Sequence, residues 1–386
     1  MELFCLLLYT INNLLILIWS AIFCFRKPSK PKNIIFTIIV FSQLLAIMLC
    51  REQIGYDYNM YAVGYRFMNE DGFTNLTYKD WEIGFVIMTK LLGMVLPNYI
   101  WYIGLLTIIA IVPAGIFICK HSEMPWLSTI LYINTFLYFM EINFLRQAVA
   151  LSIVMIAWEF MKRNKFIAFA ITIIIASLFH QTVLILIPAY FMAKMKPTAK
   201  ELIIYAYLLL WFAISSTGIL NLITNFYHEE YNNSSFLTEG VSIIYSVLPV
   251  LTTIFAFILV KSGTINVTKE NKYLINLSLM SCMMLITMSR HSIIERFSYY
   301  FLIFFILLAP VIYKSVRTSG IKLSFGETKT ISITSERSKT AVAVIFVIAV
   351  LILSYVEFYY GLFENAHGTV PYNTWLRTSW SDFLMY

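Results

Sequence analysis

Residues 3–25 read LFCLLLYTINNLLILIWSAIFCF, and residues 26–32, which follow directly, read RKPSKPK. A transmembrane helix needs about 20 mostly apolar residues, and the first stretch supplies them. Lysine and arginine gather on the cytoplasmic side of membrane spans, so the basic stretch predicts a cytoplasmic end for this helix. No basic segment or small-residue cleavage site precedes the helix. We therefore expect a retained span whose amino terminus lies outside.

The rest of the chain continues this pattern. Of its 386 residues, 60% are apolar, 17% aromatic and only 13% charged, which is typical of an integral membrane protein. Apolar stretches of near-membrane length recur throughout. The predicted spans are 3–25, 33–50, 99–119, 126–140, 147–161, 166–180, 182–193, 201–220, 241–260, 273–289, 297–313 and 340–360.

One apolar stretch, 82–96, is short, contains Lys90 and ends at Pro97. If it crossed the membrane, every later loop would change sides and the basic cluster at 314–339 would lie outside. We therefore predict an interfacial or re-entrant helix here. With this assignment 20 of the 28 basic residues lie inside, and 15 of the 21 acidic residues lie outside. The net charge of +7 thus reflects membrane orientation and does not indicate nucleic-acid binding.

The sequence therefore predicts an all-α polytopic membrane protein with about twelve transmembrane helices in one transmembrane domain, 1–386. Its polar segments are the outer loops 51–81 and 221–240, the interfacial helix 82–96, the inner loop 314–339 and the outer tail 361–386. No nucleotide-binding motif occurs, which argues against an ATP-driven pump. The five cysteines and the histidines and carboxylates show no ligand spacing, so we expect no metal and no cofactor.

Ionisable groups at the membrane boundary are costly and indicate function by default. Four outer positions carry them. The first is residues 51–61, REQIGYDYNMY, with Arg51 directly after a span. Arg51 could instead reach lipid headgroups from a simple loop, and the tyrosines could form an ordinary interfacial belt.

Arg146 and His180 occupy the second and third positions, in the segments NFLRQ and FHQ. Arg146 opens a helix from the outer side, where both the helix dipole and the positive-inside bias disfavour a cation. An anionic partner would explain this arginine. A single histidine such as His180 is often a packing residue, unless acidic or phosphate groups lie nearby.

The fourth position is residues 290–296, RHSIIER, which carries Arg290, His291, Glu295 and Arg296 between two spans. Internal pairing through Glu295 would satisfy one arginine and leave the other in excess. Guanidinium groups bind phosphate oxygens in a bidentate manner, and fixed arginines stabilise a leaving diphosphate. A histidine can deprotonate a sugar hydroxyl. These residue types therefore fit glycosyl transfer from a lipid diphosphate.

The same segments resemble a known family. The pattern Arg51-(x)3-Gly-(x)-Asp-Tyr-(x)2-Tyr, the later Trp81-Glu82-Ile83-Gly84-Phe85, the Asn143-x-x-Arg146-Gln147 helix start and Phe179-His180-Gln181 together resemble the EpsG/Wzy-type polysaccharide polymerases of bacteria. The resemblance covers roughly residues 45–310. It implies a multi-pass protein of the bacterial inner (plasma) membrane with a GT-C-like glycosyltransferase architecture and an active site facing the periplasm.

The resemblance also implies a reaction. Oligosaccharide repeat units carried on undecaprenyl diphosphate are joined, and a lipid diphosphate is released. The implied partners are these lipid-linked oligosaccharides, membrane lipids and a polysaccharide chain-length regulator, with no nucleic acid. We predict His180, His291 and Asp57 as catalytic, with the two histidines as rival bases. The remaining predictions are Arg51, Arg146, Arg290 and Arg296 for diphosphate, and Tyr56, Tyr58, Tyr61 and Glu295 for sugar.

Three alternatives remain open at the level of sequence. A ligase of the O-antigen type shares the lipid-diphosphate chemistry, although such ligases usually carry a larger and more basic periplasmic loop. A flippase or transporter of lipid-linked sugars would be expected to show an internal repeat and charges deep within its helices. A transferase that uses a polyprenyl monophosphate sugar usually carries acidic pairs early in its first outer loop, a pattern that Glu52 and Asp57 could imitate.

Overall fold

The computed structural model describes residues 3–25, 28–70, 73, 75–198, 200, 203–208, 211, 215, 218, 239–325 and 329–375. All but the last two residues of the predicted outer loop 221–240 lie outside the described residues, as do most of the predicted span 201–220 and residues 376–386 of the tail. The chain forms two compact units. The first comprises Met1–Leu184 and Phe358–Tyr386, and the second comprises Ile185–Glu357.

The chain is a mostly helical, multi-pass membrane protein. Within the described ranges, six helices are long and apolar enough to cross a membrane: Leu3–Phe25, Lys30–Leu49, Tyr99–His121, Ile244–Lys261, Ser292–Ser319 and Glu336–Phe363. The other predicted spans fall on helices that are shorter or more polar, or on residues outside the described ranges. The number of twelve spans therefore stays a prediction.

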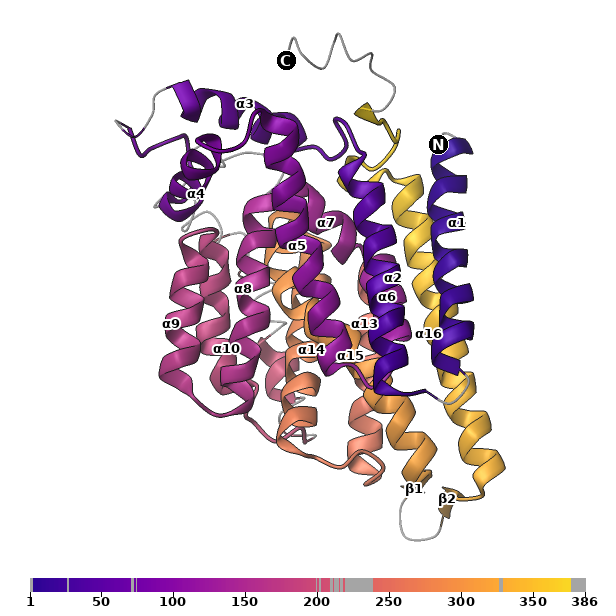
Figure 1. Cartoon of the computed structure of the whole chain (residues 1–386). Helices are drawn as coiled ribbons and strands as arrows, with labels where there is room; N and C mark the ends of the chain where they lie inside the picture. The colour runs from indigo at the N-terminus through magenta and orange to yellow at the C-terminus, as the bar shows by residue number, and fades with distance from the viewer. Residues whose placement is uncertain are drawn as a thin grey trace. The chain divides into compact units, whose positions relative to one another are not determined.

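The named elements of the first unit are all helices in the residues that the structure describes (Figure 1). Its elements are α1 (Leu3–Ser20) continued by the π-helical turn η1 (Ala21–Phe25), α2 (Lys30–Leu49), α3 (Tyr58–Glu70), α4 (Ile83–Gly93), α5 (Tyr99–His121), α6 (Pro125–Asn134), α7 (Leu137–Asn143), α8 (Leu145–Lys162), α9 (Phe166–Ser177) and η5 (Ala366–Gly368). The short 3-10 helix η2 (Gln181–Ile185) begins at its boundary. Helix α5 packs between α2 and α8, and α9 packs on α8.

Helices α3 and α4 lie at the end of this unit where α5 and α8 begin (Figure 1). Helix α3 is amphipathic, and its buried residues Tyr58, Tyr61, Tyr65 and Met68 recur at helical spacing. This face packs on an aromatic cluster that includes Trp81, Phe85 and Tyr102. The cluster anchors α3 to the ends of the longer helices.

Helix α4 occupies the region predicted as the interfacial helix 82–96. Its 11 residues rise only about 16 Å, far less than a bilayer crossing. The Lys90 ammonium, which interrupts this apolar run, is buried and donates a 2.8 Å hydrogen bond to the carbonyl of Met68 on α3. Gly93 lets α4 lie close to α3, because a Cβ there would lie 1.7 Å from Oδ1 of Asn69. The lysine and the glycine thus hold α4 against α3.

The predicted continuous span 126–140 differs from the structure, which has a break between α6 and α7. Phe136 adopts a left-handed backbone conformation with φ of 63° and separates the two helices. Its ring packs on Gly361, where a Cβ would lie 2.2 Å from the ring. The missing side chain at Gly361 makes room for the ring. Hydropathy alone could not predict this break, because the sequence is apolar on both sides of it.

The second unit contains the remaining described elements. They are α10 (Leu186–Met192), α13 (Ile244–Lys261), α14 (Lys269–Met288), η4 (Ser292–Ile294), α15 (Glu295–Ser319), β1 (Ile321–Phe325), β2 (Lys329–Ile333) and α16 (Glu336–Phe363), whose last turns belong to the first unit. Helix α14 packs closely along both α13 and α15. The all-α prediction omits the two strands.

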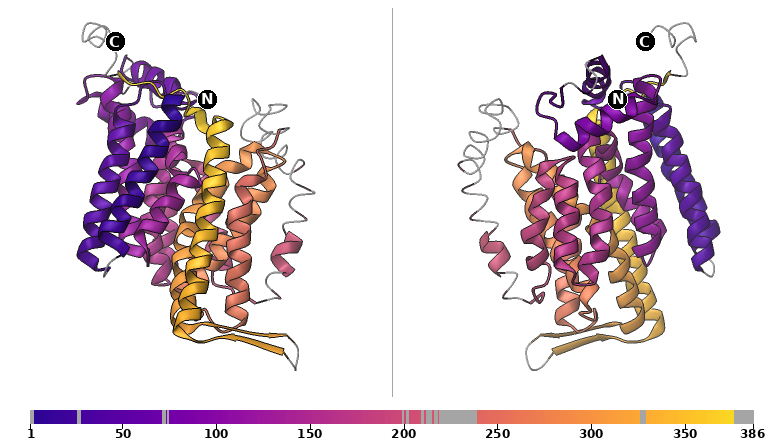
Figure 2. Two further views of the ribbon diagram at one scale, coloured as in Figure 1. Left: turned by 90° about the vertical axis from the view of Figure 1, so that its right-hand side faces the viewer. Right: turned by 60° about the vertical axis from the view of Figure 1, so that its left-hand side comes forward.

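These strands form an antiparallel hairpin within the predicted inner loop 314–339, in which Ile321 pairs with Ile333 and Phe325 with Lys329. The hairpin extends from the ends of α15 and α16 (Figure 2). The sequence IKLSF alternates apolar and polar residues, as does KTISI, which is the pattern of a strand with one covered face. Ile321 is buried with Val316 and Ala343 in the core of this unit.

Candidate functional site

The motif segment at 51–61 is joined to the one at 143–147 through Asn143. The side-chain Oδ1 of Asn143 accepts a 3.1 Å hydrogen bond from the backbone N–H of Asp57. Gly55 permits this approach: its φ is +97°, and a Cβ on it would lie 3.1 Å from the same oxygen. Only glycine adopts this backbone conformation readily, so the conformation of the loop explains why the motif has a glycine at this position. The result is a fixed position for Asp57 beside the start of α8.

Residues 365–374 cover the other side of this loop. The N–H of Gly55 donates to the carbonyl of Gly368 at 3.0 Å, and Arg51 forms an isolated β-bridge with Thr374. The Nδ2 of Asn143 lies 3.4 Å from Nδ1 of His367. The loop that carries Asp57 is thus held between α7 and the carboxyl-terminal segment.

Arg51 is buried and bonded within the protein. Its Nη1 donates to the carbonyl of Met48 at 2.8 Å and to the hydroxyl of Thr107 at 2.9 Å, and its Nη2 donates to the carbonyl of Ile142 at 3.4 Å. Its guanidinium also lies over the ring of Tyr58, 5.9 Å from the centroid. Burial lowers the pKa of this guanidinium to about 10. These bonds link the end of α2 to α5 and α7. Arg51 thereby fixes the start of the loop that carries Asp57.

The centre of the site is a carboxylate that links two of the predicted residues. Oε1 of Glu82 accepts hydrogen bonds from Nδ1 of His180 at 3.0 Å and from the N–H of Gln181 at 3.1 Å. Oε2 of Glu82 accepts one from Nη1 of Arg146 at 2.8 Å. The side chains of Glu82, His180 and Arg146 are each at most 10% exposed. We refer to these three residues as the Arg–Glu–His cluster.

A glycine explains how α4 can bring Glu82 to His180. Glu82 immediately precedes α4, and Gly84 lies in its first turn. A Cβ on Gly84 would lie 2.7 Å from both the Cβ and the carbonyl oxygen of Leu178 at the end of α9. The next amide, that of Phe85, donates to the same carbonyl at 3.2 Å. The start of α4 therefore rests directly on the end of α9, two residues before His180.

Arg146 is held by several groups besides Glu82. Its Nη1 donates to the carbonyl of Asp80 at 3.2 Å, and its Nη2 lies 3.6 Å from the Asp80 carboxylate. Its guanidinium lies 5.6 Å from the centroid of the Trp81 ring, a cation–π contact. Its backbone N–H donates to the hydroxyl of Tyr61 at 3.3 Å. The anionic partner that the sequence predicts for Arg146 is met here by two carboxylates of the chain itself.

The electrostatics of the cluster fix the form of His180. Burial alone would raise the pKa of the Glu82 carboxyl, but the hydrogen bond and charge of His180 and the charge of Arg146 lower it below its ordinary value. Glu82 is therefore ionised at neutral pH and can only accept hydrogen bonds. Nδ1 of His180 must then carry a proton, which makes Nε2 the nitrogen for any proton transfer. This is how a carboxylate orients a catalytic histidine.

The three tyrosines predicted to stack on sugars have different environments. Tyr58 and Tyr61 are buried in the face of α3 that packs on the aromatic cluster, so their rings serve helix packing in this structure. Tyr56 is 67% exposed, and its hydroxyl donates to the carbonyl of Asn365 at 2.8 Å. Tyr56 is thus the one of the three that presents its ring to the surroundings.

The remaining predicted residues, Arg290, His291, Glu295 and Arg296, belong to the second unit. They surround the short helix η4, whose Ser292 N–H donates to the carbonyl of Glu239 at 2.9 Å. The Glu295 carboxylate accepts a 2.8 Å hydrogen bond from the hydroxyl of Tyr299. His291 is buried, Arg296 is partly buried and Arg290 is exposed. No three histidine, cysteine or carboxylate side chains gather as a metal site within the described parts of the chain.

Four motif segments that are far apart in the sequence, at 51–61, 81–85, 143–147 and 179–181, thus meet in the first unit. The comparison with protein families then decides what kind of chain this is. A family model described as the EpsG family matches residues 6–326. The chain belongs to the EpsG family. The predicted resemblance is confirmed, over a longer stretch than the motifs alone cover. No curated protein and no solved structure matches the chain.

Membership of the EpsG family indicates a membrane protein of polysaccharide biosynthesis and, in general terms, a polysaccharide polymerase. The sequence predicts His180 and Arg146 as site residues and contains Glu82 within a family-like motif. It did not identify Glu82 as the residue that joins them. Nor did it select Asp80, the second carboxylate beside Arg146. The motif Trp81-Glu82-Ile83-Gly84-Phe85 carried the signal, since it places an acidic residue directly before a short apolar helix.

The arrangement in this EpsG-family chain suits proton transfer in a buried, polar setting. An oriented imidazole supported by a carboxylate is a general base, and the arginine keeps that carboxylate ionised. A guanidinium already paired with two acids is less suited to capture a diphosphate alone. The Arg–Glu–His cluster is therefore a histidine oriented by a carboxylate, which an arginine in turn holds.

Proposed function

We propose that this EpsG-family protein is a glycosyltransferase that polymerises oligosaccharide repeat units carried on undecaprenyl diphosphate, at the periplasmic face of the bacterial inner membrane. The single observation that supports this most is the hydrogen bond from His180 to Glu82, with Arg146 on the other carboxylate oxygen. The proposal retains twelve membrane crossings, both termini on the periplasmic side and a GT-C-like arrangement of helices.

The position of the cluster within the first unit supports the choice of membrane face. Arg146 lies at the start of α8, whereas Glu159 lies near its end and pairs with Lys120, His121 and Lys162. An 18-residue helix is about 27 Å long, close to the thickness of the hydrocarbon layer. The basic end is the cytoplasmic one under the positive-inside rule, which assigns the Arg–Glu–His cluster to the periplasmic end.

In the proposed reaction Nε2 of His180 removes the proton from a hydroxyl of the acceptor sugar. The oxygen attacks the anomeric carbon of the donor unit, a C–O bond forms, and the bond from that carbon to the diphosphate oxygen breaks. The proton remains on His180 until it passes to solvent, and the lipid diphosphate leaves as an anion. The charge of the leaving group requires cations.

For the second unit, we propose that Arg290 and Arg296 bind diphosphate, with His291 as the rival base and Glu295 at a sugar. Arg146 has both of its acids nearby and is assigned to holding Glu82. Asp57 and Tyr56 are assigned to sugar contacts, because the loop that carries them is fixed and Tyr56 is exposed. A polysaccharide chain-length regulator remains a proposed partner.

A polysaccharide gel from the native host tests the proposal. The gene is deleted and then restored as wild type, as His180→Ala and as His121→Ala. His121 is the matched control, since it is also a buried histidine paired with a glutamate, with Nε2 at 3.1 Å from Glu159, but it lies at the basic end of the unit. We expect His180→Ala to leave single repeat units and no ladder, and His121→Ala to retain the ladder.

Two results would contradict the proposal. Loss of single-unit material together with the ladder would indicate a ligase, a flippase or an earlier assembly step. An unchanged ladder in His180→Ala, in protein shown to insert at normal levels, would exclude His180 as the base. Loss of the ladder in His291→Ala in that case would transfer the role to the second unit.

A further inference from the structure

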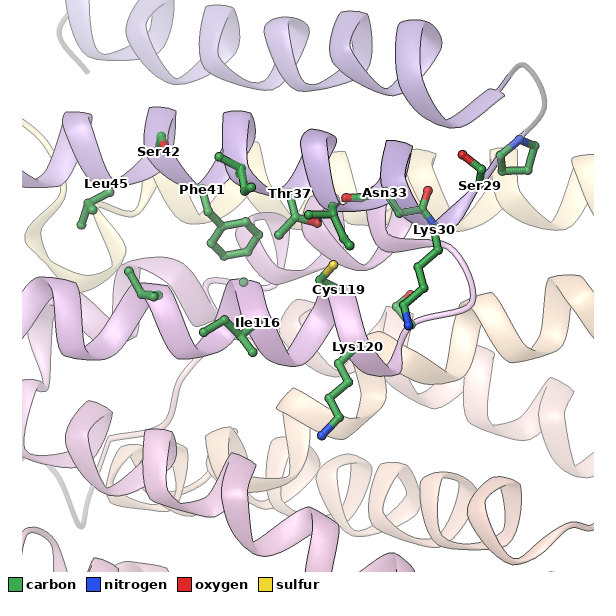
Figure 3. A pocket seen from close by; sticks show the side chains of 16 residues that line it. Ser29, Lys30, Asn33, Thr37, Phe41, Ser42, Leu45, Ile116, Cys119 and Lys120 are labelled. Atoms are coloured by element: carbon green, nitrogen blue, oxygen red, sulfur yellow. Dashed lines mark hydrogen bonds between the residues drawn. The ribbon is translucent and has the colours of Figure 1, made fainter.

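A groove of about 740 Å³ runs between α2 and α5 in the first unit (Figure 3). Thr37 and Phe41 of α2 and Gly115 of α5 form its buried floor, while Ile38 and Ile116 stand at its sides. This volume is within the range of pockets that hold small ligands. The groove lies well away from the Arg–Glu–His cluster and has no part in it.

The groove follows from the local packing of the two helices. A Cβ on Gly115 would lie 2.7 Å from Cγ of Phe41, so the ring of Phe41 rests on the backbone of α5. The flanking side chains of Ile38 and Ile116 are 61% and 62% exposed, respectively, within the part of the chain that the structure describes. In a membrane protein such an apolar, open-sided channel faces lipid chains. Its occupant must therefore be mostly apolar.

One end of the groove is polar and basic. Ser29 and Lys30, at the start of α2, and Lys120 and Ser122, at the end of α5, line this end (Figure 3). No acidic residue lines the groove among the residues that the structure describes. The ammonium of Lys120 pairs with Glu159 at 2.6 Å, and Lys120 also lines the groove. The basic end complements an anionic headgroup attached to an apolar chain.

We propose that this groove binds an anionic glycerophospholipid, with its phosphate at Lys30 and one acyl chain along Thr37, Phe41 and Gly115. A hydroxyl and an ammonium together suit a phosphate diester at the membrane surface. The acyl chain replaces bulk lipid against Ile38 and Ile116. The inference does not depend on the proposed polymerase activity.

The geometry favours a phospholipid over a sugar-carrying polyprenyl lipid. Helix α2 has 20 residues and is about 30 Å long, so Lys30 and Arg51 are separated by the thickness of the hydrocarbon layer. A headgroup held at Lys30 therefore belongs to the leaflet opposite the Arg–Glu–His cluster. A substrate lipid bound there could not reach His180, but a phospholipid of that leaflet can stabilise the pair of helices.

The test uses purified full-length protein in detergent and measures binding of phosphatidylglycerol, phosphatidylcholine and a polyprenyl monophosphate by native mass spectrometry. Lys30→Gln removes the headgroup contact, and its matched control is Lys165→Gln, an exposed lysine outside the groove. Cys119→Phe fills the groove from α5, and its control is Ile171→Phe on α9, at a position that is 53% exposed.

We expect phosphatidylglycerol to bind more tightly than phosphatidylcholine. Lys30→Gln should weaken it about five-fold, the factor that corresponds to roughly 1 kcal/mol for an interfacial lysine. Cys119→Phe should remove the bound lipid, and both controls should retain it. Equal binding of the two phospholipids, unchanged binding in Lys30→Gln, or tighter binding of the polyprenyl monophosphate would each overturn the proposal. If Cys119→Phe fails to fold, Lys30→Gln against Lys165→Gln decides the matter.

Discussion

Nδ1 of His180 donates a 3.0 Å hydrogen bond to Glu82, a residue 98 positions earlier in the chain. The contact joins the end of α9 to the start of α4. Its consequence is a fixed tautomer for His180. The first four predictions below alter this contact or its supporting groups, and the fifth alters the loop that carries Asp57.

Replacing Glu82 with Gln should abolish most of the polymerising activity. The amide can donate a hydrogen bond to Nδ1, which favours the opposite tautomer of His180 and removes the lone pair from Nε2. We expect at least a roughly 100-fold lower rate of polymer formation, the usual contribution of a general base. Polymer length and yield in membranes give the measurement. Glu159→Gln, at the basic end of α8, is the control and should keep near-normal activity.

The stability of the protein should depend on pH through Glu82. The pKa of this carboxyl is lowered in the folded state, so its contribution to stability is complete above the ordinary pKa of 4.5 and is lost as the pH falls through the lowered value. Thermal unfolding of wild type and Glu82→Gln in detergent should therefore show a constant difference at neutral and mildly acidic pH. The difference should shrink as the pH falls below 4.5 and through the lowered pKa of Glu82. A difference that grows on acidification would contradict the assignment.

Arg146→Lys should impair the site although it preserves the charge. A lysine cannot reproduce the planar guanidinium that contacts Glu82 and Asp80 and lies over Trp81. We expect a loss of activity of about ten-fold or more, since one or more charge-assisted hydrogen bonds are removed. Arg66→Lys is the control, because Arg66 is exposed on α3. Equal activity of the two variants would show that charge alone matters at position 146.

Gly84→Ala should destabilise the contact between α4 and α9. Its Cβ would meet the backbone of Leu178 at 2.7 Å, and overpacking of this kind costs about 1–3 kcal/mol. Activity should fall as Glu82 moves away from His180. Gly104→Ala on α5 is matched to it, because a Cβ there meets only a side-chain methyl at 3.5 Å. Unfolding temperatures of both variants provide the readout, and a similar change in both would count against the close approach.

Gly55→Ala tests the loop that carries Asp57. An alanine at φ of +97° is strained, and its Cβ would also crowd Oδ1 of Asn143. We expect about 1–2 kcal/mol of lost stability, concentrated in the loop. Hydrogen exchange of the Asp57 amide, which is bonded to Asn143, should accelerate more than that of α5. Uniform acceleration across the unit would show instead that the loop is not a local element.

Much of the helical framework could be predicted from hydropathy and charge. In a membrane protein, long apolar runs indicate spans and basic clusters between them indicate cytoplasmic loops. The break at Phe136 could not be predicted, since it depends on the space above Gly361, more than 200 residues away. The alternation of apolar and polar residues in IKLSF and KTISI is compatible with a hairpin from Ile321 to Ile333. The segment is also rich in lysine, serine and threonine, which is typical of a loop, and the sequence therefore predicts a loop here.

The candidate site was only partly predictable. Unfavourable placement pointed to Arg146, since a cation at an outer helix start needs an explanation, whereas the family resemblance pointed to His180. Glu82 could not be linked to them before α4 was known to rest on α9. The burial of Tyr58 and Tyr61 could have been predicted from the sequence. Their spacing, continued by Tyr65, is that of the packed face of a helix. The prediction of an outer loop at 51–81 took no account of this helical spacing.

The contacts of residues 365–374 with the loop at 51–57 have a consequence for how the chain folds during its own synthesis. The hydroxyl of Tyr56 and the carbonyl of Asn365 are 309 residues apart, and every membrane helix described here begins before Asn365 is made. A nascent chain can therefore insert nearly its whole helical framework while the segment that secures Asp57 does not yet exist. Formation of the site must therefore await synthesis of residues 365–374, and a chain interrupted before them would insert without the segment that secures Asp57.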